Sequence, residues 1–457
     1  MSVEILTAAQ SEADQRRIAG GLLAAGLGRG DRVALLTTSS GLMLSAILGS
    51  LRVGIVPVLL NAGLLDHERD ALLADAQPQL VVDDAALAGL AGAAPTELAP
   101  HPLARPMHYT SGTTGQPKGV WSGILDEDDA AGLLREEAEL WHFAPDDVHL
   151  VCSPFHHSVA IRFGGGTLLA GGTVVILGKF DAAEARRALA EHRPTTTFMV
   201  PAHLQRLFAL GGRDTLDVDG TLDASATSSL RLVVHAGSPC PAPLKHRAIA
   251  AFGVDRLWEF YGSTEGQFTA CAASEWLGHE GTVGRARAHR TLEADADGTI
   301  WCTVPAYARY EYWRDATKTA ASWRAPAPGR DDAFGAFTVG DLGRLDDEGY
   351  LYLDGRRSDL IITGGVNVYP AEIEAVLGRC DGVADVAVFA VDDDAWGQRV
   401  CAAVVGDVST EDLTRFAREH LAGYKRPKDL FVVDELPHTA TGKLQRNQVA
   451  RLLGLEP

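Results

Sequence analysis

Residues 109–119 read Tyr109-Thr110-Ser111-Gly112-Thr113-Thr114-Gly115-Gln116-Pro117-Lys118-Gly119. Four Ser or Thr side chains, three glycines and one lysine fall within this short stretch. Hydroxyl groups, backbone N–H groups and an ammonium together are the donors that bind a polyphosphate. The stretch therefore predicts a nucleoside triphosphate loop. It is not a Walker A loop, because Pro117 stands where that motif needs Gly and Gly119 where it needs Ser or Thr, so a P-loop kinase or ATPase is disfavoured.

The composition of the whole chain fits a globular protein of two or more domains. It has 457 residues, 46% of them hydrophobic and 22% charged. The net charge of −19 disfavours a nucleic-acid partner. Six widely spaced cysteines without a CxxC pair indicate reduced, buried thiols rather than a zinc site. The sequence shows neither a signal peptide nor a membrane-spanning run, so we expect a cytoplasmic protein without a membrane partner.

Strand and helix patterns alternate along most of the chain. Helices are expected at 12–26 and 41–52, and buried strands at 32–36, 55–60, 148–152, 173–177, 196–200 and 232–235. This alternation predicts an α/β fold with a largely parallel sheet, whose ligands bind at the carboxyl ends of the strands. A small α/β module is expected after residue 370, and the domain boundary at 357–359.

Several loops that follow expected strands carry polar side chains. Phe155-His156-His157-Ser158 follows one strand, and because neighbouring side chains of extended backbone face opposite ways, pocket lining is favoured over a metal site. His235-Ala236-Gly237-Ser238 and Tyr261-Gly262-Ser263-Thr264-Glu265 follow two others. The acidic run 126–129 is interpreted as the start of a helix rather than as a metal site.

The motifs, taken in order, carry a family resemblance. The phosphate loop, Tyr261 to Glu265, Thr338-Val339-Gly340-Asp341, Gly355-Arg356 with Gly364-Gly365, and Pro437 to Lys443 occur in this order over nearly the whole chain. Together they resemble the acyl-adenylate-forming superfamily, which includes acyl-CoA synthetases. The resemblance implies a large domain of layered α/β/α sheets (1–357) and a small, mobile α+β domain (358–457).

The resemblance also implies a two-step reaction and a set of residue roles. An acid and ATP give acyl-AMP and pyrophosphate, and a thiol, usually of coenzyme A, then displaces AMP. The implied catalytic residues are Lys443, Thr264 and Glu265, of which Glu265 also binds Mg²⁺. The implied ATP or AMP ligands are Thr110, Ser111, Gly112, Thr113, Thr114, Gly115, Lys118, Gly237, Ser238, Tyr261, Asp341 and Arg356.

The remaining implied roles concern the acyl group and the domain motion. The expected acyl pocket consists of His156, His157, Ser158, Arg162, His235, Gly262 and Gln267. The expected hinge is Ser358, where the family usually has Asp or Lys, with Asp359 as the alternative; Gly364 and Gly365 are expected in the CoA channel. The pocket is polar for a fatty acid and lacks the Asp of amino-acid adenylation domains. We therefore expect a small, aryl or functionalised acid. Arg162 is open to two interpretations, a second carboxylate or ring substituent of the substrate and a salt bridge within the protein.

Three functions stay open from the sequence. The first is an acyl-CoA ligase. The second is an adenylating enzyme that passes its acyl group to a carrier protein, an amine or an inorganic nucleophile. The third is a non-catalytic adenylate-binding relative, which the presence of Thr264, Glu265, Asp341, Arg356 and Lys443 argues against. A homodimer is also conceivable, although the chain ahead of the phosphate loop is shorter than in typical family members.

Overall fold

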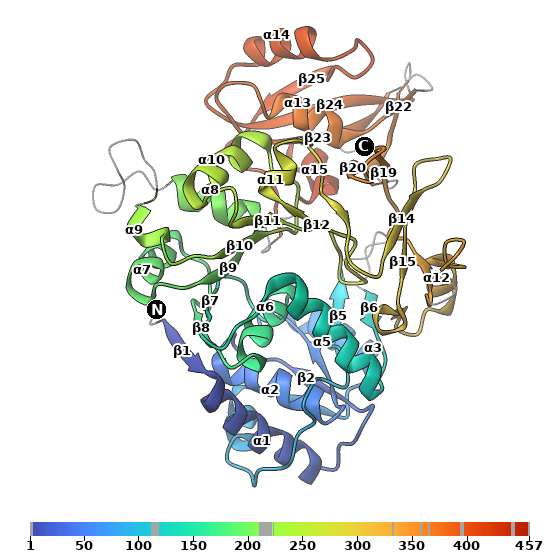
Figure 1. The fold of residues 1–457 in the computed structure, drawn as a ribbon. Helices are drawn as coiled ribbons and strands as arrows, with labels where there is room; N and C mark the ends of the chain where they lie inside the picture. The colour runs from blue at the N-terminus through green and yellow to red at the C-terminus, as the bar shows by residue number, and fades with distance from the viewer. Residues whose placement is uncertain are drawn as a thin grey trace.

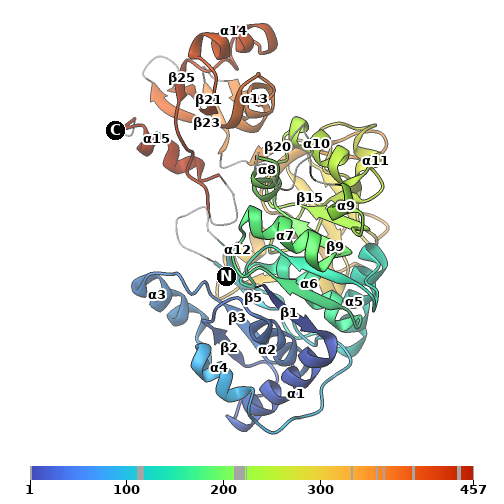
Figure 2. The ribbon, with the colours of Figure 1, turned by 90° about the vertical axis from the view of Figure 1, so that its left-hand side faces the viewer.

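A large N-terminal part and a smaller C-terminal part make up the chain (Figure 1). The computed structural model describes residues 3–110, 118–209, 222, 224–330, 333–356, 359–363, 366–393, 397–439 and 444–455. The C-terminal elements gather in one lobe at the top of the molecule, beyond α8 and α10 (Figure 2). The α/β fold and the division into a large and a small part are as predicted.

The first sheet of the N-terminal part has the strand order β16-β6-β5-β3-β2-β4. Its central strands β3, β2, β4 and β5 run parallel, and β6 returns antiparallel to β5 across the phosphate loop. The bounds are β2 (Arg32–Leu35), β3 (Val56–Leu59), β4 (Leu80–Val82), β5 (Met107–Thr110), β6 (Lys118–Trp121) and β16 (Glu311–Tyr312). The loop motif thus connects two paired strands, with Thr110 opposite Lys118.

The second sheet has the order β1-β8-β7-β9-β10-β11-β12-β13, and β8 to β11 run parallel to one another. The bounds are β1 (Glu4–Thr7), β7 (Val148–Val151), β8 (Thr173–Ile176), β9 (Thr196–Met199), β10 (Leu232–His235), β11 (Leu257–Glu259), β12 (Thr269–Ala272) and β13 (Arg285–Ala286). The loops after β7, β10 and β11 therefore lie at one edge, as ligand loops of a parallel sheet do.

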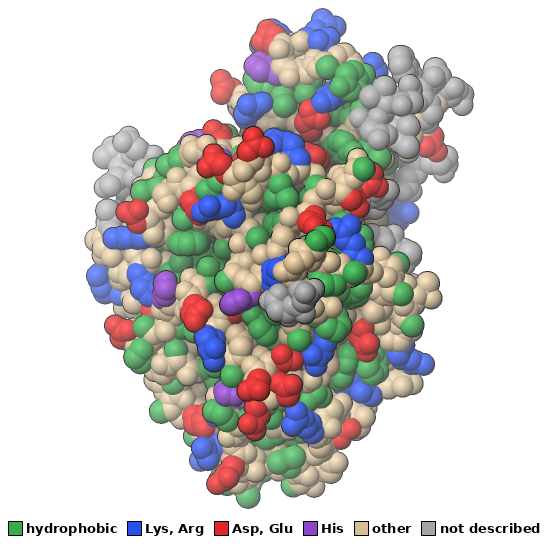
Figure 3. Space-filling model, turned by 45° about the vertical axis from the view of Figure 1, so that its right-hand side comes forward, with side chains coloured by type: hydrophobic (Ala, Val, Ile, Leu, Met, Phe, Trp, Pro, Cys, Tyr) green, Lys and Arg blue, Asp and Glu red, His purple; other side chains and the backbone are tan. Residues whose placement is uncertain are grey.

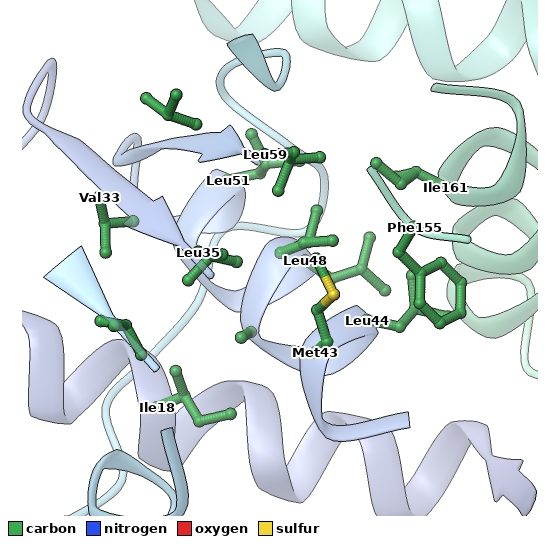
Figure 4. Packing of buried hydrophobic residues seen from close by; sticks show 14 of the residues in the cluster. Ile18, Val33, Leu35, Met43, Leu44, Leu48, Leu51, Leu59, Phe155 and Ile161 are labelled. Atoms are coloured by element: carbon green, nitrogen blue, oxygen red, sulfur yellow. The ribbon is translucent and has the colours of Figure 1, made fainter. Parts of the chain in front are cut away.

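Helices pack on both sheets and between them. The bounds are α1 (Ala8–Ala24), α2 (Gly41–Arg52), α3 (Asp66–Ala76), α4 (Asp84–Leu90), α5 (Glu127–Trp141), α6 (Ser158–Leu169), α7 (Ala182–His192), α8 (Pro201–Ala209), α9 (Ala224–Thr227), α10 (Ala242–Phe252), α11 (Ala273–Trp276) and α12 (Ala316–Ala321). Ile161 of α6 packs with Leu44 and Leu48 of α2 in the largest core (Figure 4). Phe163 of the same helix packs in a second core with Phe260. One helix thus joins the two layers.

Smaller sheets complete the N-terminal part and build the C-terminal one. The bounds are β14 (Thr291–Ala294), β15 (Ile300–Val304), β17 (Trp323–Arg324), β18 (Gly335–Phe337), β19 (Asp341–Leu345) and β20 (Leu351–Arg356). In the C-terminal part they are β21 (Ile361–Thr363), β22 (Val366–Val368), α13 (Pro370–Leu377), β23 (Val383–Asp393), β24 (Gly397–Gly406), α14 (Thr410–His420), β25 (Asp429–Val432) and α15 (Val449–Leu452). β21 to β25 form a separate five-stranded sheet.

Most predicted elements occur within a few residues of the expected bounds. The acidic run begins α5 as predicted, with Asp126 accepting a hydrogen bond from the backbone N–H of Asp129 at 2.8 Å. One strand was not predicted, and one expectation was wrong. The residues around Leu6 form β1, which pairs antiparallel with β8. Cys240 is half-buried, whereas the other five cysteines are buried as expected.

Candidate active site

A tight hairpin between β11 and β12 carries several predicted site residues. Gly262 and Gln267 form an isolated bridge, and the N–H of Ser263 donates to the carbonyl of Gly266 at 2.8 Å. Thr264 and Glu265 therefore lie at the tip of the turn. A Cβ on Gly262 would come within 2.8 Å of the Gln267 amide, so a larger residue here would displace that side chain.

Glu265 belongs to a cluster that includes the end of the phosphate loop. The hydroxyl of Tyr312 donates to Oε1 of Glu265 at 2.9 Å, and the ammonium of Lys318 lies 3.8 Å from the centre of the Tyr312 ring. The ammonium of Lys118 lies 3.1 Å from Oδ2 of Asp315. Burial lowers the pKa of Lys318, although the charge of Glu265 acts in the opposite direction. A single buried carboxylate beside lysines fits Mg²⁺, which takes one or two carboxylates together with phosphate oxygens.

Tyr261 and Asp341 meet on the other side of the hairpin. The Tyr261 hydroxyl donates to Oδ2 of Asp341, which is buried at the start of β19. The Tyr261 ring packs 4.6 Å from the ring of Phe268, centre to centre. Asp341 is paired in register with Arg356 at the end of β20. The structure thus brings together the three residues expected near adenine and ribose, and the Arg356 side chain lies outside the described atoms.

His235 points away from the other expected pocket residues. The ammonium of Lys245 on α10 lies 2.6 Å from Nε2 of His235 and donates to Oε2 of Glu259 at 2.9 Å. All three side chains are buried. Burial, together with the charge of Lys245, holds the pKa of His235 well below its usual range. Lys245, His235 and Glu259 form a buried triad. Through Lys245 it links β10, which precedes the Gly237-Ser238 loop, to β11, which precedes the Tyr261 loop.

The histidines after β7 form the acyl end of the candidate site. The rings of His156 and His157 lie 4.2 Å apart, and Ser158 begins α6. Burial lowers the pKa of His157 to about 3, so its imidazole is neutral. Its Nε2 is buried and has no hydrogen-bond partner in the part of the chain that the structure describes. His108 of β5 joins them through Nδ1, 3.1 Å from the carbonyl oxygen of His156.

Arg162 forms a salt bridge within the protein, one of its two anticipated roles. Its Nε lies 3.4 Å from Oε2 of Glu137, and its guanidinium lies 5.6 Å from the centre of the Phe260 ring. Burial would raise the pKa of Glu137, but Arg162 and Arg287 outweigh it and lower that pKa to about 2. Arg162 of the expected acyl pocket thus contacts Phe260, the residue before Tyr261 in the hairpin.

Several predicted residues lie outside the described ones. These are Ser111, Gly112, Thr113, Thr114, Gly115, Ser358, Gly364, Gly365 and Lys443, together with the side chain of Thr110. Within the described residues, no group of three His, Cys, Asp or Glu side chains is arranged to hold a metal ion. No helix among them is long and apolar enough to cross a membrane.

The sequence reasoning missed several residues that the fold brings to the site. Tyr312 and Lys318 approach Glu265 from a segment with no motif of its own, and Lys245 of α10 lies in no recognised motif. Glu137, the partner of Arg162, likewise lies in no recognised motif. The one sequence signal for Lys318 is the run Asp315 to Lys318, in which Asp315 caps α12.

Comparison with known proteins identifies the class. The family described as AMP-binding enzyme matches residues 2–103 and 92–297, and the AMP-binding enzyme C-terminal domain matches 372–443. A 2-succinylbenzoate–CoA ligase of Geobacillus sp. (strain WCH70) is 32% identical, over 94% of this chain and 89% of the relative. The chain belongs to the AMP-binding enzymes, that is, to the acyl-adenylate-forming superfamily.

Solved structures agree with this assignment. ATP-bound MatB from Rhodopseudomonas palustris superposes with a TM-score of 0.82 at 29% identity, over 97% of this chain and 93% of that one. The o-succinylbenzoate CoA synthetase MenE of Bacillus subtilis, in complex with the acyl-adenylate OSB-AMP, gives 0.79 at 28% identity, over 96% and 92%. The same enzyme has been solved with ATP and a magnesium ion. The present chain is an AMP-forming acid–CoA ligase that uses ATP, Mg²⁺ and coenzyme A.

The described residues can perform distinct parts of this chemistry. Asp341 can accept hydrogen bonds from ribose hydroxyls, and the ring of Tyr261 can stack on a purine. Lys118 and Lys318 carry positive charge near Glu265 and can stabilise negative charge that develops on a phosphate bound there. When bound, Mg²⁺ neutralises phosphate charge. The neutral His157 can donate or accept a hydrogen bond at the acyl group without adding a charge there.

Proposed function

We propose that this ligase activates a small aryl or otherwise functionalised carboxylic acid, with the reacting carboxylate held next to Tyr261 and Thr264. The observation that carries the proposal is the junction at Phe260-Tyr261. Phe260 packs in the core with Trp141 and lies under the Arg162 guanidinium, while Tyr261 binds Asp341. An acyl group entering from the adenylate side therefore meets rings and polar groups, which suit a short functionalised acid better than a long alkyl chain.

The residue roles form part of the same proposal. Thr110 to Lys118 hold the β- and γ-phosphates, Thr264 the α-phosphate, and Glu265 the metal. Asp341 and Arg356 hold the ribose, and Lys443 stabilises the charge where the carboxylate meets the α-phosphate. The support is the convergence of four residues from three separate elements: Lys118 from β6, Tyr261 and Glu265 from the hairpin between β11 and β12, and Asp341 from β19.

A domain rotation between the two steps also belongs to the proposal. Residues 358–457 would turn about Ser358 to exchange Lys443 for Gly364-Gly365 at the site. In the described residues, the side-chain amide of Gln205 on α8 donates to the carbonyl of Ala384 in β23 at 2.8 Å. A single exposed hydrogen bond of this kind breaks at little cost, so it allows the C-terminal part to rotate relative to the N-terminal part. We further propose a cytoplasmic location.

The test is product detection by mass spectrometry. The enzyme is incubated with ATP, Mg²⁺ and a panel of acids, with and without coenzyme A, while AMP and pyrophosphate are quantified. The panel includes 2-succinylbenzoate, benzoates, arylacetates and fatty acids of increasing length. We expect acyl-CoA from an aryl or functionalised acid. Acyl-CoA from long-chain fatty acids alone would contradict the proposal, and acyl-AMP unchanged by coenzyme A would indicate another acceptor.

A further inference from the structure

A lysine outside every recognised motif lies close to the carboxylate of the β11–β12 hairpin. Lys318 is the third residue of α12, and Asp315, which precedes that helix, accepts its backbone N–H at 3.0 Å. Lys318 is half-buried. Its ammonium lies 3.8 Å from the centre of the Tyr312 ring, and the hydroxyl of Tyr312 donates to Oε1 of Glu265 at 2.9 Å. One tyrosine thus joins the lysine to the buried carboxylate.

The segment that carries Lys318 is fixed against β6, the strand that follows the phosphate loop. β16 pairs antiparallel with β6. The backbone N–H of Trp313 donates to the carbonyl of Gly119 at 2.8 Å. α12 is held to β16, because the hydroxyl of Thr319 accepts the backbone N–H of Tyr312 at 2.9 Å. Hydrogen bonds to the backbone therefore set the position of Lys318 relative to the end of the phosphate loop.

The two lysines near Glu265 differ in how their charge is compensated. The ammonium of Lys118 lies 3.1 Å from Oδ2 of Asp315 and forms an ion pair. The ammonium of Lys318 lies on an aromatic face and forms neither an ion pair nor a hydrogen bond with any residue of the described ranges. Burial lowers the pKa of Lys318, while the charge of Glu265 opposes this and that of Lys118 adds to it. The three N–H groups of this ammonium can therefore bind an anion.

Lys318 does not belong to a general basic surface. On the face shown in Figure 3, acidic and basic side chains are interspersed. The net charge of the chain is −19, so the protein as a whole does not attract anions. Two ammoniums gathered at the end of the phosphate loop thus form a local feature. A phosphate group is an anion that lysines bind as point charges, so it fits this arrangement.

We propose that Lys318 binds the pyrophosphate part of ATP and holds it as it leaves, which makes Lys318 a further catalytic residue of the first step. The proposal rests on the proposed function, since it takes Glu265 as the metal ligand beside those phosphates. In that step an oxygen of the acid bonds to the α-phosphorus, the bond from that phosphorus to the bridging oxygen breaks, and its electron pair stays on pyrophosphate. The Lys318 ammonium donates hydrogen bonds to this anion, and Lys118 supplies a second positive charge.

The first test measures binding without any acid, so it does not depend on the identity of the substrate. Calorimetric titrations give the dissociation constants of Mg·ATP, Mg·pyrophosphate and AMP. Lys318→Met keeps an unbranched side chain and removes its charge. We expect it to raise the constants for Mg·ATP and Mg·pyrophosphate about 10-fold, the scale of one hydrogen bond to a charged group, and to leave that for AMP unchanged. Lys318→Arg should restore most of the affinity.

The matched control is Arg344→Met. Arg344 is exposed on β19, and its guanidinium lies 4.3 Å from the centre of the Tyr352 ring, so it too is a cation on a tyrosine. This variant should bind all three ligands as the unmodified protein does. A change as large as that in Lys318→Met would show that loss of any such cation weakens binding, and it would overturn the proposal.

Repeating the ATP titration in EDTA separates two modes of action. A direct contact persists without Mg²⁺, because the ammonium of Lys318 touches the phosphates themselves. We therefore expect Lys318→Met to weaken binding of ATP in EDTA as well. An effect seen only with Mg²⁺ would show that the lysine acts through Glu265, and it would overturn the proposal.

The second test separates the two steps of the reaction with the acid that the panel identifies. In Lys318→Met the rate of acyl-AMP formation should fall about 10-fold. Thioester formation from supplied acyl-AMP should keep its rate, because no pyrophosphate takes part in that step. A loss of equal size in both steps would contradict a role confined to pyrophosphate.

The outcomes separate this proposal from the proposed function. Equal losses of affinity for AMP and for Mg·ATP would show a structural role for Lys318, and unchanged affinity for all three ligands would show no role. Either result would overturn the proposal. A loss confined to Mg·ATP and Mg·pyrophosphate, found together with activity on long-chain fatty acids alone, would support the role of Lys318 and contradict only the proposed class of acid.

Discussion

The adenylate side and the acyl side of this site differ in how their charges are compensated. On the adenylate side each described charged group has a partner from another element: Glu265 has Tyr312, Asp341 has Tyr261, and Lys118 has Asp315. On the acyl side three arginines, Arg162, Arg287 and Arg290, share the carboxylates of Glu136 and Glu137 and form an arginine cluster. Nε2 of His157 is buried and has no hydrogen-bond partner among the described residues.

The difference reflects what each side must recognise. Every enzyme of this class binds the same nucleotide, so the nucleotide side can be a fixed set of groups that support one another. The acid differs from one enzyme to another, so the proposed acyl side can carry polar groups that a substrate is able to bond.

The largest expected effect comes from removing Lys443, the residue by which the C-terminal part is proposed to contribute to the adenylate side. Lys443→Ala should lower the rate of acyl-AMP formation about 1,000-fold, the scale for removing a charge that stabilises a transition state. Thioester formation from supplied acyl-AMP should survive. The two half-reactions are measured separately by pyrophosphate release and by acyl-CoA formation. Equal loss of both steps would contradict the assigned role.

A somewhat smaller effect is expected when the carboxylate of the hairpin loses its charge. Glu265→Gln keeps the hydrogen bond from Tyr312 but removes a hard anionic ligand of Mg²⁺. We expect kcat for AMP release to fall about 100-fold and the Mg²⁺ concentration for half-maximal rate to rise. A Mg²⁺ titration of both proteins provides the measurement. An unchanged Mg²⁺ dependence would remove Glu265 from the metal site.

The buried triad behind the adenylate loops provides a contrast with the arginine cluster, because its charges are matched. Lys245→Met would leave Glu259 buried without its cation, and we expect the free energy of unfolding to fall by about 3 kcal/mol. Adding Glu259→Gln should restore part of that loss. Urea unfolding of the single and double variants measures both values. A negligible change in Lys245→Met would show that the pair adds nothing.

The smallest effect concerns pH and the acyl side. The pKa of His108 is about 4 in the folded protein against an ordinary value of 6.5, so the folded protein leaves it neutral while the unfolded chain protonates it. This contribution to stability is present above about pH 6.5 and is lost as pH falls towards 4. The free energy of unfolding of the unmodified protein should therefore fall between pH 7 and pH 5. In His108→Asn this fall should be smaller by about 1–2 kcal/mol.

Urea unfolding at the two pH values measures this difference. The control is Arg187→Gln, which removes an exposed arginine of α7 that pairs with Glu184. Because such a surface pair adds little stability, its free energy of unfolding should stay within about 0.5 kcal/mol of that of the unmodified protein at both pH values. A His108→Asn curve parallel to that of the unmodified protein would mean that His108 titrates normally in the fold.

Much of the fold could be predicted from local patterns. Alternating apolar segments such as 148–152 and 196–200 became buried parallel strands, because residues buried on both faces form continuous apolar runs. The phosphate loop, the Tyr261 to Glu265 segment and Asp341 could also be recognised, since their chemistry is fixed by the nucleotide. The N-terminal strand was missed because Ile5 and Leu6 gain their conformation only by pairing with β8.

The sequence by itself determined the class of this protein: an α/β chain with a nucleotide loop and the ordered motifs of acyl-adenylate formation. Only the tertiary structure decided which side chains compensate one another. Tyr312 meets Glu265 across 47 positions and Arg290 meets Glu136 across 154. Long-range electrostatic pairing of this kind depends on the distances set by packing and on burial, and neither is encoded in the local order of residues.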